Sequence, residues 1–153
     1  MRDFHLRFFI EKRWPDGMVN IIDDDETNLR IPQNGGAYII GSSDRTMFIY
    51  PWGSSPIFYI GQSSNLSKRI NEHKKYILKA INDHEEEYWW PRYQFAASFG
   101  ADVAWYSIRG NQNPNTLESD LITTFYEVYG AIPHANGTWP SGLRPKHGAR
   151  DDK

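Results

Sequence analysis

The sequence predicts a small domain that combines a β-sheet with helices. Short segments rich in β-branched and aromatic residues are bounded by glycine and proline, as strands usually are. Two longer segments repeat apolar residues every three or four positions, which is typical of helices that pack on a sheet. The 153 residues suit one compact domain.

Composition and charge exclude several classes of protein. No apolar run approaches the roughly 18 to 20 residues that span a bilayer, and the first residues lack a signal-peptide pattern, so we expect a cytoplasmic protein with no membrane partner. Cysteine is absent, which excludes disulfides, thiolate zinc sites and a cysteine nucleophile. The histidines show no paired metal-ligand spacing, so a bound metal would be a hard ion held by oxygen. The net charge of −2 argues against a protein that coats nucleic acid.

Six segments have the pattern of strands. Phe4–Ile10 and Met18–Ile22 flank a turn that contains Pro15 and Gly17, so we expect an N-terminal hairpin. The other four predicted strands are Ala37–Ile40, Met47–Tyr50, Ile57–Ile60 and Val103–Ile108. We expect Pro51–Pro56 to be a loop.

Two helices are predicted. The first runs from about Ser64 to Ile81, and Ser63 or Ser64 can cap it. Its apolar stripe comprises Leu66, Ile70, Ile77, Leu78 and Ile81. Residues 85–99 mix charged and aromatic side chains and fit no element. The second helix runs from near Pro114 to Tyr129, with Asn113 as its cap and Gly130 as its end.

Polar residues interrupt the apolar faces of both helices. His73 lies seven residues after Leu66, within the apolar stripe. Arg69 precedes His73 by one turn, so both side chains can point to one spot. On the second helix, Glu118 aligns with apolar residues that follow it by four, seven and eleven positions. It is therefore expected to face the body of the protein.

Each of these residues has a structural and a functional interpretation. A buried histidine is often only a hydrogen-bonded core residue. A buried carboxylate needs a partner, which for Glu118 is either a salt bridge to Arg69 or a metal ion. Taken together, an inward arginine, histidine and glutamate beside a tyrosine-bearing sheet predict a polar pocket with acid–base capacity.

The order of these residues resembles the GIY-YIG nuclease family. The matching positions are Gly36-Ala37-Tyr38, Tyr59-Ile60-Gly61, Ser63, Leu66, Arg69, His73, Leu117-Glu118, Ile122, Pro133 and Asn136. Two features depart from the family pattern: alanine stands in the first triplet where isoleucine is usual, and the tyrosines are about twenty residues apart, nearly double the usual gap. We expect the interval from Gly41 to Pro56 to form an enlarged hairpin, which leaves the pairing register of the two tyrosines open.

The resemblance implies an α/β fold of the α+β type, with a small three-stranded antiparallel sheet flanked by helices. The chain would then divide into an N-terminal β-hairpin extension over 1–34, a nuclease-like domain over 35–137 and a flexible C-terminal tail over 138–153. The implied activity is endonucleolytic hydrolysis of phosphodiester bonds in DNA, with Mg²⁺ or Mn²⁺ as the cofactor. We expect a compact stand-alone enzyme of the restriction, phage or repair type.

The resemblance also implies the roles of individual residues. Tyr38 would deprotonate or orient the attacking water, and Tyr59 would support the same network. Arg69 would hold the scissile phosphate, a task that suits a planar guanidinium. His73 would transfer protons, because the unperturbed pKa of histidine lies near neutrality. Glu118 would bind the metal.

Other residues are assigned supporting roles. Asn136 would hold the geometry of the site rather than take part in the chemistry. Lys68, Lys74 and Lys75 lie on the first helix and would contact the nucleic-acid backbone, although solvated lysines on a helix are as common. Trp52 and the pair Trp89-Trp90 could stack on bases, but packing within the protein is the simpler interpretation.

Two other functions are compatible with the sequence. A domain with this fold could bind nucleic acid or another protein without cutting, although a module that only binds has no need of an inward glutamate. An RNA-directed nuclease also fits the motif. Specificity for a target would come from the N-terminal hairpin, the enlarged hairpin, the tail, a homodimer or a partner.

Overall fold

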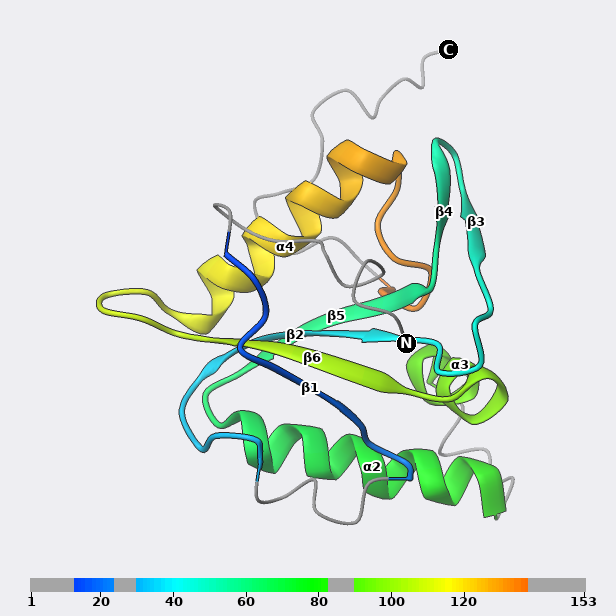
Figure 1. The fold of residues 1–153 in the computed structure, drawn as a ribbon, viewed down its shortest axis with the longest axis horizontal. Helices are drawn as coiled ribbons and strands as arrows, with labels where there is room; N and C mark the ends of the chain where they lie inside the picture. The colour runs from blue at the N-terminus through cyan, green and yellow to red at the C-terminus, as the bar shows by residue number, and fades with distance from the viewer. Residues whose placement is uncertain (1–12, 24–29, 83–89, 138–153) are drawn as a thin grey trace.

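The computed structural model describes residues 13–23, 30–82 and 90–137, and it has the α+β architecture that the sequence predicts (Figure 1). A four-stranded antiparallel sheet has the order β1–β6–β2–β5. Its strands are β1 Gly17–Asn20, β2 Gly36–Gly41, β5 Ile57–Ser63 and β6 Asp102–Ser107. A separate hairpin is formed by β3 Phe48–Tyr50 and β4 Gly53–Ser55. The helices in the described ranges are α2 Leu66–Asn82, α3 Pro91–Phe99 and α4 Pro114–Tyr129.

Helices cover both faces of the sheet. Helix α4 lies on one side of the sheet, whereas α2 and α3 lie on the other (Figure 1). Strand β2 is central, and all six of its residues are buried. Because side chains alternate along a strand, Tyr38 and Ile40 pack with α2, while Ala37 and Ile39 pack with α4. The strand that carries the first predicted tyrosine is therefore enclosed on both faces.

The prediction of a three-stranded sheet is wrong, because β1 adds a fourth strand. Strand β1 pairs with β6, and Val19 lies opposite Val103. This pairing covers an edge of β6 that would otherwise expose unpaired backbone groups. The other half of the predicted hairpin, Phe4–Ile10, lies outside the described residues. Met18–Ile22 therefore contributes a strand to the central sheet, which the hairpin pattern alone did not indicate.

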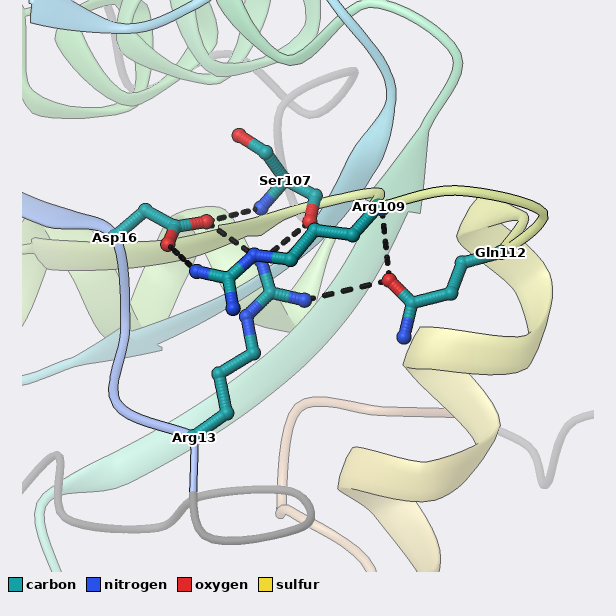
Figure 2. A network of polar contacts seen from close by, with 5 residues as sticks. All are labelled: Arg13, Asp16, Ser107, Arg109 and Gln112. Carbon is teal, nitrogen blue, oxygen red and sulfur yellow. Dashed lines mark hydrogen bonds and ion pairs between the residues drawn. The ribbon is translucent and has the colours of Figure 1, made fainter.

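A carboxylate holds β1 against the end of β6 (Figure 2). Asp16 accepts a hydrogen bond from the backbone N–H of Ser107 at 2.7 Å and forms ion pairs with Arg13 at 2.7 Å and Arg109 at 2.9 Å. Arg13 also donates to the Ser107 carbonyl, and the side-chain oxygen of Gln112 accepts from the backbone N–H of Arg109. These contacts join segments about ninety residues apart in sequence.

The enlarged interval between the two tyrosines forms the β3–β4 hairpin beside the sheet. Gly53–Ser55 is a strand, so the prediction of a loop over Pro51–Pro56 is wrong for this part. Strands β2 and β5 still pair directly, and Tyr38 lies opposite Gly61 while Ile40 lies opposite Tyr59. The pairing register of β2 with β5, which the sequence leaves open, therefore places Tyr38 and Tyr59 on the same face of the sheet.

The helix ends agree only in part with the sequence. The cap of α2 is Asn65 rather than a serine, because its side-chain oxygen accepts from the backbone N–H of Lys68 at 3.0 Å. Ser63 instead accepts from the backbone N–H of Asn65. The prediction for α4 is confirmed: Asn113 accepts from Thr116 N–H, and Gly130 ends the helix with a φ of 79°.

Helix α3 lies within residues 85–99, for which the sequence predicts no element.

None of the helices in the described ranges combines the length and apolar character that crossing a bilayer requires. The tail over 138–153 lies outside the described residues.

Candidate active site

A cluster of polar and aromatic side chains lies where β2 and β5 meet α2 and α3. We call it the tyrosine–arginine cluster, and its members are Tyr38, Tyr59, Arg69, His73, Arg92 and Tyr93. Strands β2 and β5 supply the first two tyrosines, α2 supplies Arg69 and His73, and α3 supplies the last two residues. Four of the residues predicted from the sequence are therefore brought together.

His73 is hydrogen-bonded through both ring nitrogens. Its Nε2 lies 2.5 Å from the hydroxyl of Tyr38, and its Nδ1 lies 3.1 Å from the hydroxyl of Tyr93. A neutral imidazole carries one proton, so one nitrogen donates and the other accepts. His73 and Tyr38 are completely buried, with exposed fractions of 0%.

Burial sets the protonation states of this pair. Desolvation lowers the pKa of His73 well below its ordinary value, and the positive charges of Arg69 and Arg92 lower it further. His73 is therefore neutral at neutral pH. Desolvation also raises the pKa of Tyr38, with a further contribution from Tyr59, so Tyr38 carries its proton.

The glycine of the second triplet makes room for Tyr38. Gly61 lies opposite Tyr38 on the neighbouring strand. A Cβ atom at Gly61 would lie 2.6 Å from the Tyr38 hydroxyl and 3.0 Å from the ring of Tyr59. The position therefore requires glycine because of the close approach of the two rings, and this packing directs the Tyr38 hydroxyl toward His73.

Tyr59 and Arg69 form the partly exposed side of the cluster. The ring centre of Tyr59 lies 6.3 Å from that of Tyr38 and 6.0 Å from that of His73. The side chain of Arg69 is 32% exposed and pairs with Glu72 at 3.7 Å. Burial acts to lower the pKa of Arg69, but its proximity to Tyr38, then to Tyr93 and Tyr59, raises the pKa on balance. Arg69 is a permanent cation that can reach both the buried pair and solvent.

Asn136 holds the strand that carries Tyr59. Its side-chain oxygen accepts from the backbone N–H of Ile60 at 2.9 Å, and its side-chain nitrogen donates to the Ile60 carbonyl at 2.9 Å. The next residue toward the N-terminus, Ala135, donates to the carbonyl of Phe58 at 2.8 Å. Strand β5 is an edge strand, and this segment pairs with its outer side. Asn136 thus fixes the backbone directly beside Tyr59.

Glu118 comes from the opposite layer of the molecule. It lies near the start of α4, across the sheet from α2 (Figure 1). Burial raises the pKa of its carboxyl. Among the described residues the ion-pair partner of Arg69 is Glu72, so the salt bridge to Arg69, one of the two alternatives for Glu118, is not formed. Glu118 is a partly desolvated carboxylate, a donor that suits a hard cation.

The described residues contain no group of three or more acidic or histidine side chains that could hold a metal ion. Mg²⁺ is often held by one or two carboxylates, with waters and substrate phosphates completing the shell. A site based on Glu118 fits this second arrangement.

The predicted nucleic-acid-binding lysines lie apart from the cluster. Lys68 and Lys75 are exposed, and at about 100° per residue they lie on the side of α2 opposite its buried face. Lys74 flanks that buried face on the side away from Arg69. These positions place the lysines along an outer surface of the helix rather than beside the buried pair.

Arg92 and Tyr93 lie outside the residues that the sequence motif predicts for the site. Both belong to α3, which has little amphipathic pattern and buries only Tyr93 and Ala96. The signal that could have identified this helix is Pro91 at its first position, followed by apolar and small residues.

Comparisons with protein-family models, with curated protein sequences and with solved structures found no match to this chain. The functional assignment therefore rests on the arrangement of its own residues.

Proposed function

We propose that this protein is a cytoplasmic endonuclease of the GIY-YIG type that hydrolyses phosphodiester bonds in DNA with the aid of a divalent metal ion. The observation that carries the proposal is the tyrosine–arginine cluster. The sequence resemblance predicts that Tyr38, Tyr59, Arg69 and His73 form one site. Tyr38 and His73 are 35 residues apart in sequence and meet there through a hydrogen bond.

The residues divide into a buried pair and a partly exposed pair. Tyr59 and Arg69 are the groups that a phosphate could reach. Arg69 would hold the phosphate and stabilise the charge that gathers on its oxygens during attack by water. A guanidinium suits this task because it stays charged and presents several donors in one plane.

The buried pair, Tyr38 and His73, would position the partly exposed residues and take part in proton transfer. Burial and the two arginines disfavour a charged His73, so its role would be to relay a proton between its two hydrogen-bonded nitrogens rather than to hold one. Tyr38 would orient Tyr59, the partly exposed residue that could contact the attacking water, through the packing of its ring and its hydrogen bond to His73. Asn136 would keep β5 in place so that these groups retain their spacing.

Glu118 would hold the metal ion, which when bound would polarise a phosphate oxygen. The partial burial of Glu118 without an ion-pair partner among the described residues supports this assignment. A carboxylate in that setting gains stability from a cation.

A second candidate is a module that binds nucleic acid without cutting it. The complete burial of Tyr38 and His73 favours this alternative, because fully enclosed side chains are suited to a structural role. RNA as the substrate is compatible with either function, because backbone phosphates are common to both nucleic acids.

The experiment that tests the proposal is cleavage of supercoiled plasmid by the purified protein with Mg²⁺ or Mn²⁺. We expect cleavage by the parent protein and its loss in Arg69→Ala, in Glu118→Ala and in the presence of EDTA. Arg109→Ala is a matched control, because this arginine pairs with Asp16 at the β1 edge of the sheet. Cleavage by Glu118→Ala at the parental rate would remove the metal assignment. Tight binding of DNA and of RNA without cleavage of either would replace the nuclease with the binding module.

A further inference from the structure

Arg92 lies within a set of aromatic rings next to the candidate active site. Its guanidinium carbon lies 5.2 Å from the ring centre of Tyr59, 5.0 Å from that of Trp90 and 5.1 Å from that of Tyr93. These contacts hold the guanidinium by cation–π attraction. Tyr59 is a predicted catalytic residue, and Tyr93 is a hydrogen-bond partner of His73. Arg92 is therefore a direct neighbour of the residues proposed to cut DNA.

The positive charge of Arg92 has no counter-charge in the described part of the chain. None of the ion pairs among the described residues includes Arg92. Its Nε atom is buried and has no hydrogen-bond partner within the described ranges. A buried donor without a partner costs free energy, so the arrangement is incomplete as it stands.

The surroundings of Arg92 increase this excess of positive charge. Arg92 is the second residue of α3, where the positive end of the helix dipole disfavours a cation. Arg69 is the other cation of the cluster, and both arginines act on His73 to lower its pKa. Among the residues that the structure describes, Arg69 is partly compensated by Glu72, whereas Arg92 has no acidic partner. An anion that contacts the two guanidinium groups would offset this excess of positive charge.

We propose that Arg92 is a second phosphate-binding residue, which together with Arg69 holds the backbone of the nucleic acid at the site. This inference rests on the proposed function and deepens it by naming a residue outside the motif. The planar guanidinium can donate two parallel hydrogen bonds to phosphate oxygens. The aromatic rings fix its plane, so little side-chain freedom is lost when a phosphate binds.

Salt-dependent binding tests this role separately from cleavage. A short fluorescein-labelled DNA duplex, and an RNA of the same sequence in a second arm, are titrated with protein in EDTA between about 50 and 200 mM salt. Each phosphate contact contributes roughly 0.9 to the slope of log affinity against log salt. We expect Arg92→Ala to lower that slope by about 1 and the affinity about tenfold. We expect Arg92→Lys to restore the slope while restoring the affinity only in part.

Arg109→Gln is the matched control. Arg109 is bound to Asp16 beside β1, at the edge of the sheet opposite the β5 strand that carries Tyr59. Its substitution should leave the slope unchanged. Thermal unfolding of each variant separates a loss of phosphate contact from a loss of folded protein, because a merely structural role would move the melting temperature and not the slope.

The outcomes distinguish this inference from the proposed function. An unchanged slope in Arg92→Ala for both nucleic acids, or an equal fall in Arg109→Gln, would overturn the role of Arg92 even if the parent protein cuts plasmid. A parent protein that neither binds nor cuts nucleic acid would overturn both proposals. A fall in slope with either DNA or RNA that Arg92→Lys reverses would support the role and would identify the nucleic acid.

Discussion

The hydroxyl of Tyr38 lies 2.5 Å from Nε2 of His73, and solvent reaches neither side chain. The tyrosine comes from the central strand of the sheet and the histidine from the middle of a helix. Burying two polar groups is costly unless they satisfy each other. This hydrogen bond is therefore both a requirement of the packing and the link between the sheet and α2 at the candidate site.

The buried, neutral His73 makes stability depend on pH. Its pKa in the folded protein is well below the value of about 6.5 that applies to the unfolded chain. The unfolded chain thus takes up a proton that the folded protein excludes, and stability falls as the pH drops below about 6.5, by at most about 1.4 kcal/mol per pH unit. Denaturant unfolding across this range should show the loss in the parent protein and not in His73→Gln. The control His134→Gln should retain it, and an identical pH profile for all three proteins would contradict the assignment.

Gly61 should tolerate no side chain. A methyl group there would lie 2.6 Å from the Tyr38 hydroxyl, so the ring must move away from His73. We expect Gly61→Ala to lower the free energy of unfolding by about 1–3 kcal/mol through overpacking. Gly53→Ala is the matched control, because a methyl group there would meet Tyr129 at an ordinary 3.5 Å. Equal unfolding midpoints for the two variants would show that the space beside Tyr38 is not limiting.

Asn136 should control the local stability of β5. Its two hydrogen bonds to Ile60 are lost in Asn136→Ala, at a cost of roughly 1–3 kcal/mol. The specific signature is faster hydrogen exchange of the Ile60 amide. Asn71→Ala removes a hydrogen bond within α2 and should leave that amide unaffected. Unchanged protection of the Ile60 amide in Asn136→Ala would rule out a role for this side chain in holding the strand.

Asp16 should stabilise the β1 edge only while it is ionised. Burial acts to raise its pKa, but the Ser107 amide and then Arg13 and Arg109 lower the pKa on balance. A carboxyl group whose pKa is lowered in the folded protein stabilises the fold at pH values above its ordinary pKa of 3.8. That stabilisation is lost as the pH falls through the folded-state pKa. At neutral pH, Asp16→Asn should unfold about 1–2 kcal/mol more easily. The difference between the variant and the parent should shrink below about pH 4. A difference that stays constant with pH would mean that the charge is unimportant.

Replacement of Glu118 should stabilise the metal-free protein and abolish its stabilisation by metal. Burial raises its pKa, so ionisation opposes folding at neutral pH and stability is lost as the pH rises through the carboxyl pKa. We therefore expect Glu118→Gln to raise the melting temperature in EDTA. Mg²⁺ or Mn²⁺ should raise the melting temperature of the parent, because a ligand that binds only the folded state stabilises it, and should not do so for the variant. The control Glu127→Gln changes an exposed residue on the same helix. An equal metal-induced shift in Glu118→Gln would place the metal elsewhere.

The elements with strong local signals were predicted well. Helix α4 begins and ends where the Asn113 cap, the proline and Gly130 indicate. Helix α3 was missed because its nine residues bury only two side chains and give no clear periodicity. The cap of α2 was misassigned because serine and asparagine are both good caps, and local sequence does not decide which side chain reaches the amide.

Side-chain order along the chain predicts the apolar strand over Ala37–Ile40 and the apolar stripe of α2 with His73 inside it, and the family resemblance adds the set of candidate residues. The tertiary structure determines which strands pair and which side chains come into contact. Pairing of β1 with β6 made a four-stranded sheet, since a strand chooses its partner by the free edge available in space. The same packing brought Arg92 against Tyr59, 33 positions away in sequence. Such contacts depend on the shape of the whole sheet and its helices, and no local pattern encodes them.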